Sequence, residues 1–235
     1  MVKQIIKVLA LVAVALVSGL VGGQLASSYL IGDFSLALDN NTIQGPFPVA
    51  QKEVIIRENE AIVAAIAKVS GIAISVEVAD AKGAVTRGSG VIITSDGMAA
   101  VPYGLYPPGS QAKVMVGGQK VSYTVLKRDK AANIAILKLE GSNWPTAGFY
   151  SVEDVKMGQR VFMVGTLSES NIFANEGIVR TVSASSVGTN IIETPPAAGS
   201  PVFDIEGSII GMALVDNAGF VSAIPIAKIK ELSGL

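Results

Sequence analysis

The chain has 235 residues, of which 50% are hydrophobic, and carries 18 basic against 19 acidic residues, with no histidine and no cysteine. This length suffices for one or two small domains, and the high apolar content excludes a disordered chain. A net charge of −1 leaves no cationic excess for a phosphate backbone, so nucleic acid is not an expected partner. Without histidine there is no Ser-His-Asp triad and no histidine-ligated zinc, and without cysteine there is no disulfide or thiolate nucleophile.

The amino terminus, residues 1–32, predicts a membrane segment. Lys3 and Lys7 precede an uncharged run from Val8 to Gly32 that would reach ~37 Å as a helix, against a hydrocarbon core of ~30 Å. The basic residues keep the amino terminus in the cytoplasm, so we expect a single-pass protein whose carboxyl-terminal domain lies outside it. The alternative is a cleaved signal peptide, since small residues such as Ser18 and Ala26 supply cleavage points, and the domain is then secreted.

A linker and an amphipathic helix are expected next. Residues 33–51 are rich in turn-forming residues, and they include an N-glycosylation pattern at Asn40 that matters only in a host that glycosylates. From Lys52 to Ser70, apolar residues recur at helical spacing, which predicts a helix that packs on the following domain rather than a coiled coil. The stripe consists of Ile55, Ile62, Ile66 and Val69.

After Gly71 the pattern changes to short β-branched runs separated by Gly, Pro, Asn or Asp, which predicts an all-β sandwich or barrel pair. Only the final stretch, Pro225 to Leu232, has helical spacing. The expected strands are Ile72 to Val78, Gly90 to Thr94, Lys113 to Val116, Lys120 to Leu126, Ile134 to Leu139, Arg160 to Val164, Gly177 to Ser183, Asn190 to Glu193, Ser208 to Val215 and Phe220 to Ile224.

Seven segments between Glu58 and Leu235 together resemble the trypsin-like protease domain of the HtrA (DegP-like) family. No single segment is specific, but they follow the family's order along the chain. They are a helix and strand at residues 60–76, a GSGVII…DG hairpin at 88–97, a strand similar to D-L-A-V-L-K at 133–138, strands at 158–165 and 176–179, the Gly199-Ser200-Pro201-Val202 region through Gly211, and Ala223-Ile224-Pro225-Ile226.

The resemblance implies the chymotrypsin-type fold, two six-stranded β-barrels with the active site between them. We therefore expect the leading helix and first barrel at residues 52–148, and the second barrel with its closing helix at 149–235. The chain stops at that helix, so we expect no PDZ domain after it. The resemblance implies no cofactor and no metal, and the sequence leaves the oligomeric state open, a trimer included.

The resemblance also assigns positions to the catalytic residues, and these positions carry other residues here. The family's histidine falls on Gly104 and its aspartate on Asn133. Counted back from Pro201, the nucleophilic serine falls on Ala198. The oxyanion-hole donor two residues earlier falls on Pro196, which has no backbone N–H. The expectation is therefore a pseudoprotease with no catalytic residue of its own.

An exported, membrane-tethered and inactive domain is expected to bind or regulate another protein or peptide. One candidate partner is an active HtrA-like chain in a mixed oligomer. The alternative is a serine endopeptidase with relocated residues, in which Ser200 pairs with Lys113, Lys120 or Lys138 in a Ser-Lys arrangement. Against that alternative, Ser200 is expected to be a small residue that replaces glycine at a tight turn.

Three further features each have a functional and a structural interpretation. Acidic Asp204, Glu206 and Asp216 could hold calcium, but solvated turn aspartates are expected because no EF-hand spacing is present. The glycine pairs of residues 88–90 and 117–118 lack the lysine of a phosphate cradle, so both are expected to be hairpin turns. The loop containing Tyr103, Tyr106, Pro107 and Pro108 is expected either to form an adhesive groove edge or to pack internally.

Overall fold

The computed structural model describes residue 7 and residues 12–19, 50–79, 84–106, 109, 111–167 and 171–235. The chain separates into two units, Met1–Pro48 and Val49–Leu235, and the second unit contains both β-sheets. Most of the expected membrane segment at 1–32 and of the linker at 33–51 lies outside the described residues. Within the described ranges, no helix combines the length and the apolar character needed to cross a membrane.

Helix α2 (Ala50–Val69) leads into the domain and continues into the short 3₁₀ helix η1 (Ser70–Ile72). Ile62 and Val69 are buried and Ile66 packs against the core, which confirms three members of the expected stripe. The fourth, Ile55, has a side chain outside the described set. A Cβ added to Gly207 would lie 3.1 Å from Val69, so the end of α2 contacts the second barrel.

The first sheet has seven strands, one more than expected, in the order β5-β4-β1-β2-β3-β7-β6. Its two edge strands, β5 and β6, are separated in the chain only by Ser122, whose carbonyl accepts the N–H of Glu140. The expected strand Lys120 to Leu126 is therefore interrupted at Ser122, before which it pairs with β4 and after which it pairs with β7. The first sheet is thus not the closed six-stranded barrel that was expected. The strands are β1 (Ala73–Ala79), β2 (Val85–Ile92), β3 (Met98–Pro102), β4 (Gln111–Val116), β5 (Gln119–Val121), β6 (Tyr123–Asp129) and β7 (Ile134–Leu139).

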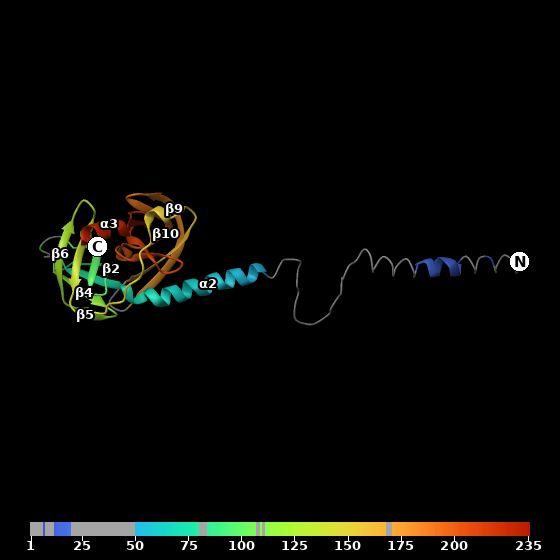
Figure 1. Cartoon of the computed structure of the whole chain (residues 1–235), viewed down its shortest axis with the longest axis horizontal. Coiled ribbons are helices and arrows are strands. Elements are labelled where there is room, and N and C mark those ends of the chain that lie inside the picture. The colour runs from blue at the N-terminus through green and yellow to red at the C-terminus, as the bar shows by residue number, and fades with distance from the viewer. Residues whose placement is uncertain are drawn as a thin grey trace. The chain divides into compact units, whose positions relative to one another are not determined.

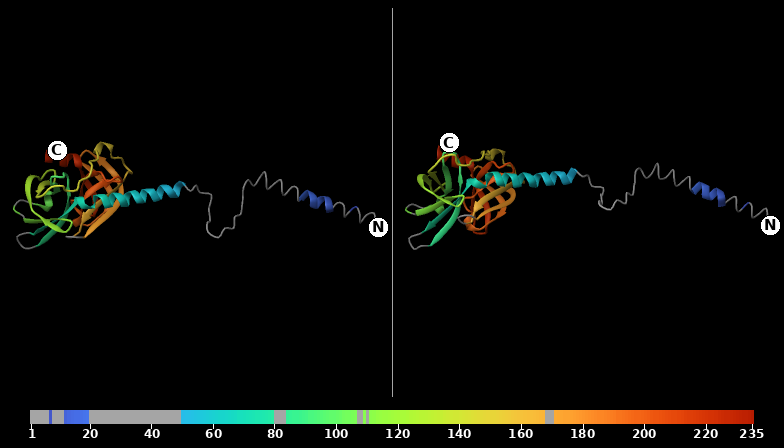
Figure 2. Two further views of the ribbon diagram at one scale, coloured as in Figure 1. Left: turned by 60° about the horizontal axis from the view of Figure 1, so that its bottom comes forward. Right: turned by 90° about the horizontal axis from the view of Figure 1, so that it is seen from below.

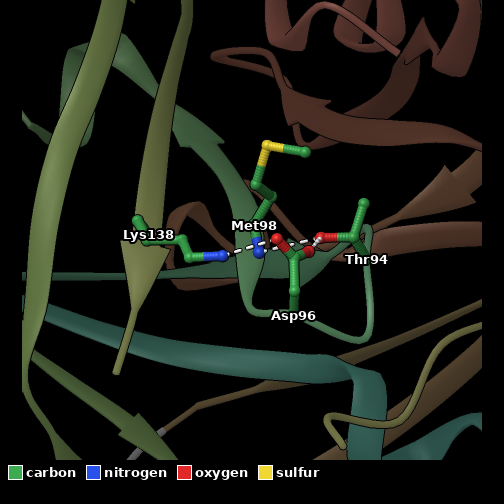
Figure 3. Close-up of polar contacts among 4 residues, drawn as sticks. All are labelled: Thr94, Asp96, Met98 and Lys138. Atoms are coloured by element: carbon green, nitrogen blue, oxygen red, sulfur yellow. Dashed lines mark hydrogen bonds and ion pairs between the residues drawn. The ribbon is translucent and has the colours of Figure 1, made fainter. Parts of the chain in front are cut away.

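The turn between β2 and β3 is fixed by side chains (Figure 3). Thr94 Oγ1 donates to Asp96 and accepts the N–H of Met98 at 3.0 Å, while Lys138 Nζ donates to the other oxygen of Asp96 at 2.6 Å. The hydrogen bond from Lys138, followed by that from Thr94, lowers the pKa of Asp96 below its ordinary value. This turn sets the direction of β3, which leads to Gly104.

The second sheet is, as expected, a closed six-stranded barrel. Its strand order is β10-β13-β12-β11-β8-β9. Its interior is filled by aliphatic side chains such as Val161, Val187 and Ile210. Helix α3 (Ile226–Ser233) closes the chain, with Ile226 and Ile229 buried. The strands are β8 (Arg160–Thr166), β9 (Ile172–Ser183), β10 (Ser186–Ile192), β11 (Pro201–Asp204), β12 (Ile209–Val215) and β13 (Phe220–Pro225).

The two sheets share one core. Phe162 of β8 and Phe203 of β11 stack with centroids 5.2 Å apart and belong to the same buried cluster as Ile74, Val91 and Leu137 of the first sheet. Figures 1 and 2 show the two sheets side by side in every view. Because each sheet buries apolar side chains against the other, the junction between them is rigid enough to position a site.

The sequence analysis missed two strands, β3 and β11, and it was wrong about one pair of glycines. The glycines at 88 and 90 lie inside β2 and not in a hairpin turn. A Cβ on Gly88 would approach Leu105 to 2.0 Å, and one on Gly90 would approach Val101 to 2.6 Å. Gly90 is therefore required by close packing, because a Cβ there would also lie 2.7 Å from the Ala100 carbonyl oxygen, whereas at Gly88 the Leu105 side chain would have to move. The pair at 117–118 does connect β4 to β5 as a turn.

Candidate functional site

The positions that the sequence assigned to catalysis lie at the junction of the two sheets. Gly104 lies in the 3₁₀ helix η2 (Tyr103–Leu105) after β3, and its N–H donates to Oδ1 of Asn133 at 3.0 Å. The N–H of Tyr103 donates to the Asn133 carbonyl at 3.1 Å. A Cβ on Gly104 would meet only Asn133 Oδ1, at 3.7 Å. The structure thus brings the first two predicted positions together and leaves room for a Cβ at residue 104.

Asn133 ends the turn between β6 and β7 with φ of 55°, in the left-handed region. Asparagine tolerates this conformation better than most residues because its short polar side chain bonds locally. The amide oxygen accepts the Gly104 N–H, so this side chain connects the turn to η2.

Ala198 approaches the first sheet through its backbone. Its carbonyl accepts the N–H of Ser89 in β2 at 2.8 Å. The following Gly199 has φ of 91°, and a Cβ there would lie 1.8 Å from the Ser89 carbonyl and 2.8 Å from Pro102. Pro102 is two residues before Gly104. The loop containing Ala198 is therefore packed against both β2 and the end of β3, beside the Gly104–Asn133 pair.

The backbone donors before Ala198 point into a turn. Pro195–Ala197 forms the 3₁₀ helix η4, in which Ala197 N–H donates to Thr194 at 2.9 Å and Ala198 N–H donates to Pro195 at 3.0 Å. Pro196 has no N–H to offer. An oxyanion hole needs preorganised free donors aimed at the developing charge. The sequence predicted that Pro196 supplies no donor. It did not predict that the Ala198 N–H is hydrogen-bonded within η4.

Ser200 is fully buried, and its Oγ has no hydrogen-bond partner among the described residues. The hydroxyl lies against Gly165, where an added Cβ would come within 2.0 Å of it. None of the three lysines considered as its partner donates to it. Lys138 is bound to Asp96 instead. The structure therefore does not bring Ser200 together with any of these three lysines.

One polar contact at the sheet junction was missed from sequence. Ser89 Oγ accepts the N–H of Thr166 at 3.0 Å and donates to the Thr166 carbonyl at 3.3 Å, and both residues are buried. Because Ser89 lies in β2 and Thr166 ends β8, this pair joins the two sheets directly behind the Ala198 loop. No sequence motif marks it.

In the loop that contains Tyr103 and Tyr106, Tyr106 packs internally. Tyr106 is 5% exposed, and its hydroxyl lies 2.8 Å from that of Tyr123, which donates to the Ala112 carbonyl. Burial, followed by the hydrogen bond with Tyr106, raises the pKa of Tyr123 to about 12. Tyr103 is half-buried, and Pro107 and Pro108 lie outside the described residues.

The three carboxylates considered for calcium lie in two separate turns. Asp204 Oδ1 accepts the N–H groups of Glu206 and Ser208, and Asp216 Oδ1 accepts those of Ala218 and Phe220. Over the described ranges, no three acidic side chains gather in a way that could hold a metal ion.

A closed barrel joined to a second, bent sheet, with a loop junction between them, defines a trypsin-like domain. Residues 83–212 match the family model described as a trypsin-like peptidase domain, and the chain belongs to that family.

The chain is also similar to proteins named as probable periplasmic serine endoproteases, DegP-like. It is 26% identical to that of Halomonas elongata over 53% of this chain and 28% of the relative. It is 26% identical to that of Pseudomonas putida over 59% and 32%, and 24% identical to that of Pseudomonas fluorescens over 62% and 34%. The chain thus spans about a third of the length of these relatives. They support an HtrA-like domain.

Proposed function

We propose that this chain is a catalytically inactive HtrA-type domain that acts as a protein-binding or regulatory module outside the cytoplasm. The observation that carries the proposal is the state of the Ala198 loop. Its predicted nucleophile position holds a methyl group, its N–H is bonded within η4, and Pro196 lacks a donor. The base cannot come from elsewhere in the usual form, because the chain contains no histidine.

Magnitudes favour inactivity over reduced activity. Removal of triad residues in a serine protease costs up to ~10⁶ in turnover. Loss of one oxyanion-hole donor costs ~10² to 10³ in kcat. With both changes present, residual peptidase activity falls to the level of the uncatalysed reaction.

The competing function is a peptidase with relocated residues, for which Ser200 is the candidate nucleophile. A nucleophile must reach the substrate and needs a base within hydrogen-bond distance. Ser200 is fully buried, and its hydroxyl has no partner among the described residues. These two facts favour the inactive domain.

The location and partners extend the same proposal. The relatives are named as periplasmic, and the uncharged run from Val8 to Gly32 is long enough to anchor the chain in a membrane. We place the domain outside the cytoplasm, bound to a protein or peptide partner. An active HtrA-like protease in a shared oligomer, such as a trimer, is one such partner.

A fluorophosphonate probe tests inactivity directly, because it phosphonylates only serines activated by a base, with fluoride as the leaving group. The purified full-length chain is treated beside an active DegP-like protease and a Ser200→Ala variant. We expect labelling of the active protease alone. Labelling of the parent chain that disappears in Ser200→Ala would establish the relocated nucleophile and refute inactivity.

Partner binding needs its own test. The tagged full-length chain is expressed, crosslinked and recovered from membranes, and the captured proteins are compared with those recovered by the tag alone. Recovery of a DegP-like protease or another protein above that background supports the regulatory module. Recovery of nothing above background counts against it.

A further inference from the structure

Three basic residues lie together at the border of the candidate site. Lys127 and Arg128 lie in the last, turn-proximal part of β6, Lys130 lies in the turn that follows, and all three are exposed. The same turn ends at Asn133, whose Oδ1 accepts the Gly104 N–H. We call Lys127, Arg128 and Lys130 the basic turn. The basic turn is therefore linked to the candidate site through Asn133, which belongs to the same turn.

The basic turn is not neutralised within the described part of the chain. The side-chain ion pairs among the described residues include those of Arg87, Lys138 and Arg160, and the basic turn forms none of them. The acid inside the turn, Asp129, is half-buried and uses Oδ1 to accept the Ala132 N–H at 2.9 Å. The side chains of the basic turn are therefore available to an external anion.

Arg128 is held in position by an aromatic ring. Its guanidinium carbon lies 5.1 Å from the centroid of Tyr106, and Tyr106 is buried and bonded to Tyr123. A cation–π contact does not use up the guanidinium N–H donors, which stay available to a carboxylate. A preorganised arginine loses less entropy on forming a bidentate contact than a free one does.

Charge is segregated between the two sheets. Residues 84–139 contain seven basic and two acidic residues, whereas residues 149–235 contain five basic and nine acidic ones. Figure 1 places β6 on the side of the first sheet away from β9 and β10. The acidic barrel therefore does not offset the positive potential at the basic turn, which attracts and orients an anionic partner.

We infer that the basic turn binds an acidic, extended segment of the partner protein, an inference that rests on the proposed binding function. The three cations lie within four consecutive residues of the chain, so a short segment that carries several carboxylates is enough to contact more than one of them. A phosphate backbone fits less well, since three contacts give only a shallow salt dependence and the chain has no overall positive charge.

The test measures fluorescence anisotropy of a short labelled peptide in which glutamate alternates with alanine, with the purified full-length chain as receptor. The test variant carries Lys127→Glu, Arg128→Glu and Lys130→Glu. The matched control carries Lys68→Glu, Lys156→Glu and Arg180→Glu, three exposed cations elsewhere, of which Arg180 also lies over an aromatic ring, that of Phe220. Circular dichroism verifies that all three proteins are folded.

The inference predicts that the test variant binds the peptide about tenfold to a hundredfold more weakly, that the control binds like the parent, and that added salt weakens parental binding. Equal loss in the control would overturn it, as would tighter binding of an oligonucleotide of the same charge. These outcomes do not depend on whether the chain is a peptidase. If the chain is labelled by fluorophosphonate but binds the peptide through the basic turn, the proposal of inactivity is refuted and the proposed binding surface is supported.

Discussion

The backbone N–H of Gly104 donates a hydrogen bond to Oδ1 of Asn133, at 3.0 Å. These residues are 29 positions apart, and they occupy the places where the family resemblance put a histidine and the aspartate that orients it. The frame that would hold those two side chains is therefore present, and a Cβ at residue 104 meets only ordinary contacts.

This relationship predicts that the triad can be inserted without restoring activity. The variant Gly104→His, Asn133→Asp, Ala198→Ser is expected to fold but to cleave casein at the blank rate, because both oxyanion donors are still lacking. Adding Pro196→Gly supplies one donor and frees η4 to open, and cleavage should then rise by ~10² or more over the triple variant.

The triple variant alone is the informative control. If it cleaves casein well above blank, the Ala198 N–H leaves η4 readily, and the hydrogen bond to Pro195 does not limit the site. If the quadruple variant is folded and remains inert, a further part of the site is misplaced.

Replacing either of two buried serines by alanine should change the free energy of unfolding, in opposite directions. Ser200→Ala removes a buried Oγ that has no partner in the described structure and should raise the free energy of unfolding by about 1 kcal/mol. Ser89→Ala leaves the Thr166 N–H unsatisfied and should lower it by about 1 to 3 kcal/mol. Chemical denaturation of both variants beside the parent measures the difference. Destabilisation by Ser200→Ala would mean that its hydroxyl does have a partner.

The raised pKa of Tyr123 predicts that the folded protein loses stability at alkaline pH. Its pKa in the folded protein is raised to about 12, whereas an unfolded tyrosine titrates near ~10. A raised pKa favours the protonated form in the folded state, so the contribution is complete below pH ~10 and is lost between about pH 10 and 12. Thermal melts across this range should show a decline that is smaller in Tyr123→Phe. An equal decline in that variant would assign the effect to other groups.

Most of the fold could be predicted from sequence because most strands carry β-branched runs bounded by turn residues. The two missed strands lack that signal. Strand β3, Met98–Pro102, is rich in alanine and ends in proline, and β11, Pro201–Asp204, has only four residues. Both are buried, and their strand conformation depends on pairing with distant neighbours, β7 and β8, which local propensity does not encode.

The sequence predicted which positions make up the candidate site but not the hydrogen bonds around them. Counting along family motifs placed Gly104, Asn133 and Ala198, and the structure gathers their segments at one junction. The Ala198 N–H bond within η4 and the Ser89–Thr166 pair could not be predicted, because each depends on the three-dimensional path of a loop.

The most direct test of the proposed inactivity measures casein cleavage by the purified full-length chain. An active DegP-like protease serves as the positive control, and Ser200→Ala serves as the matched variant. We predict that the parent and Ser200→Ala both release peptides at the blank rate while the control digests casein. Cleavage by the parent that is lost in Ser200→Ala would contradict this prediction and identify a serine peptidase with a relocated nucleophile.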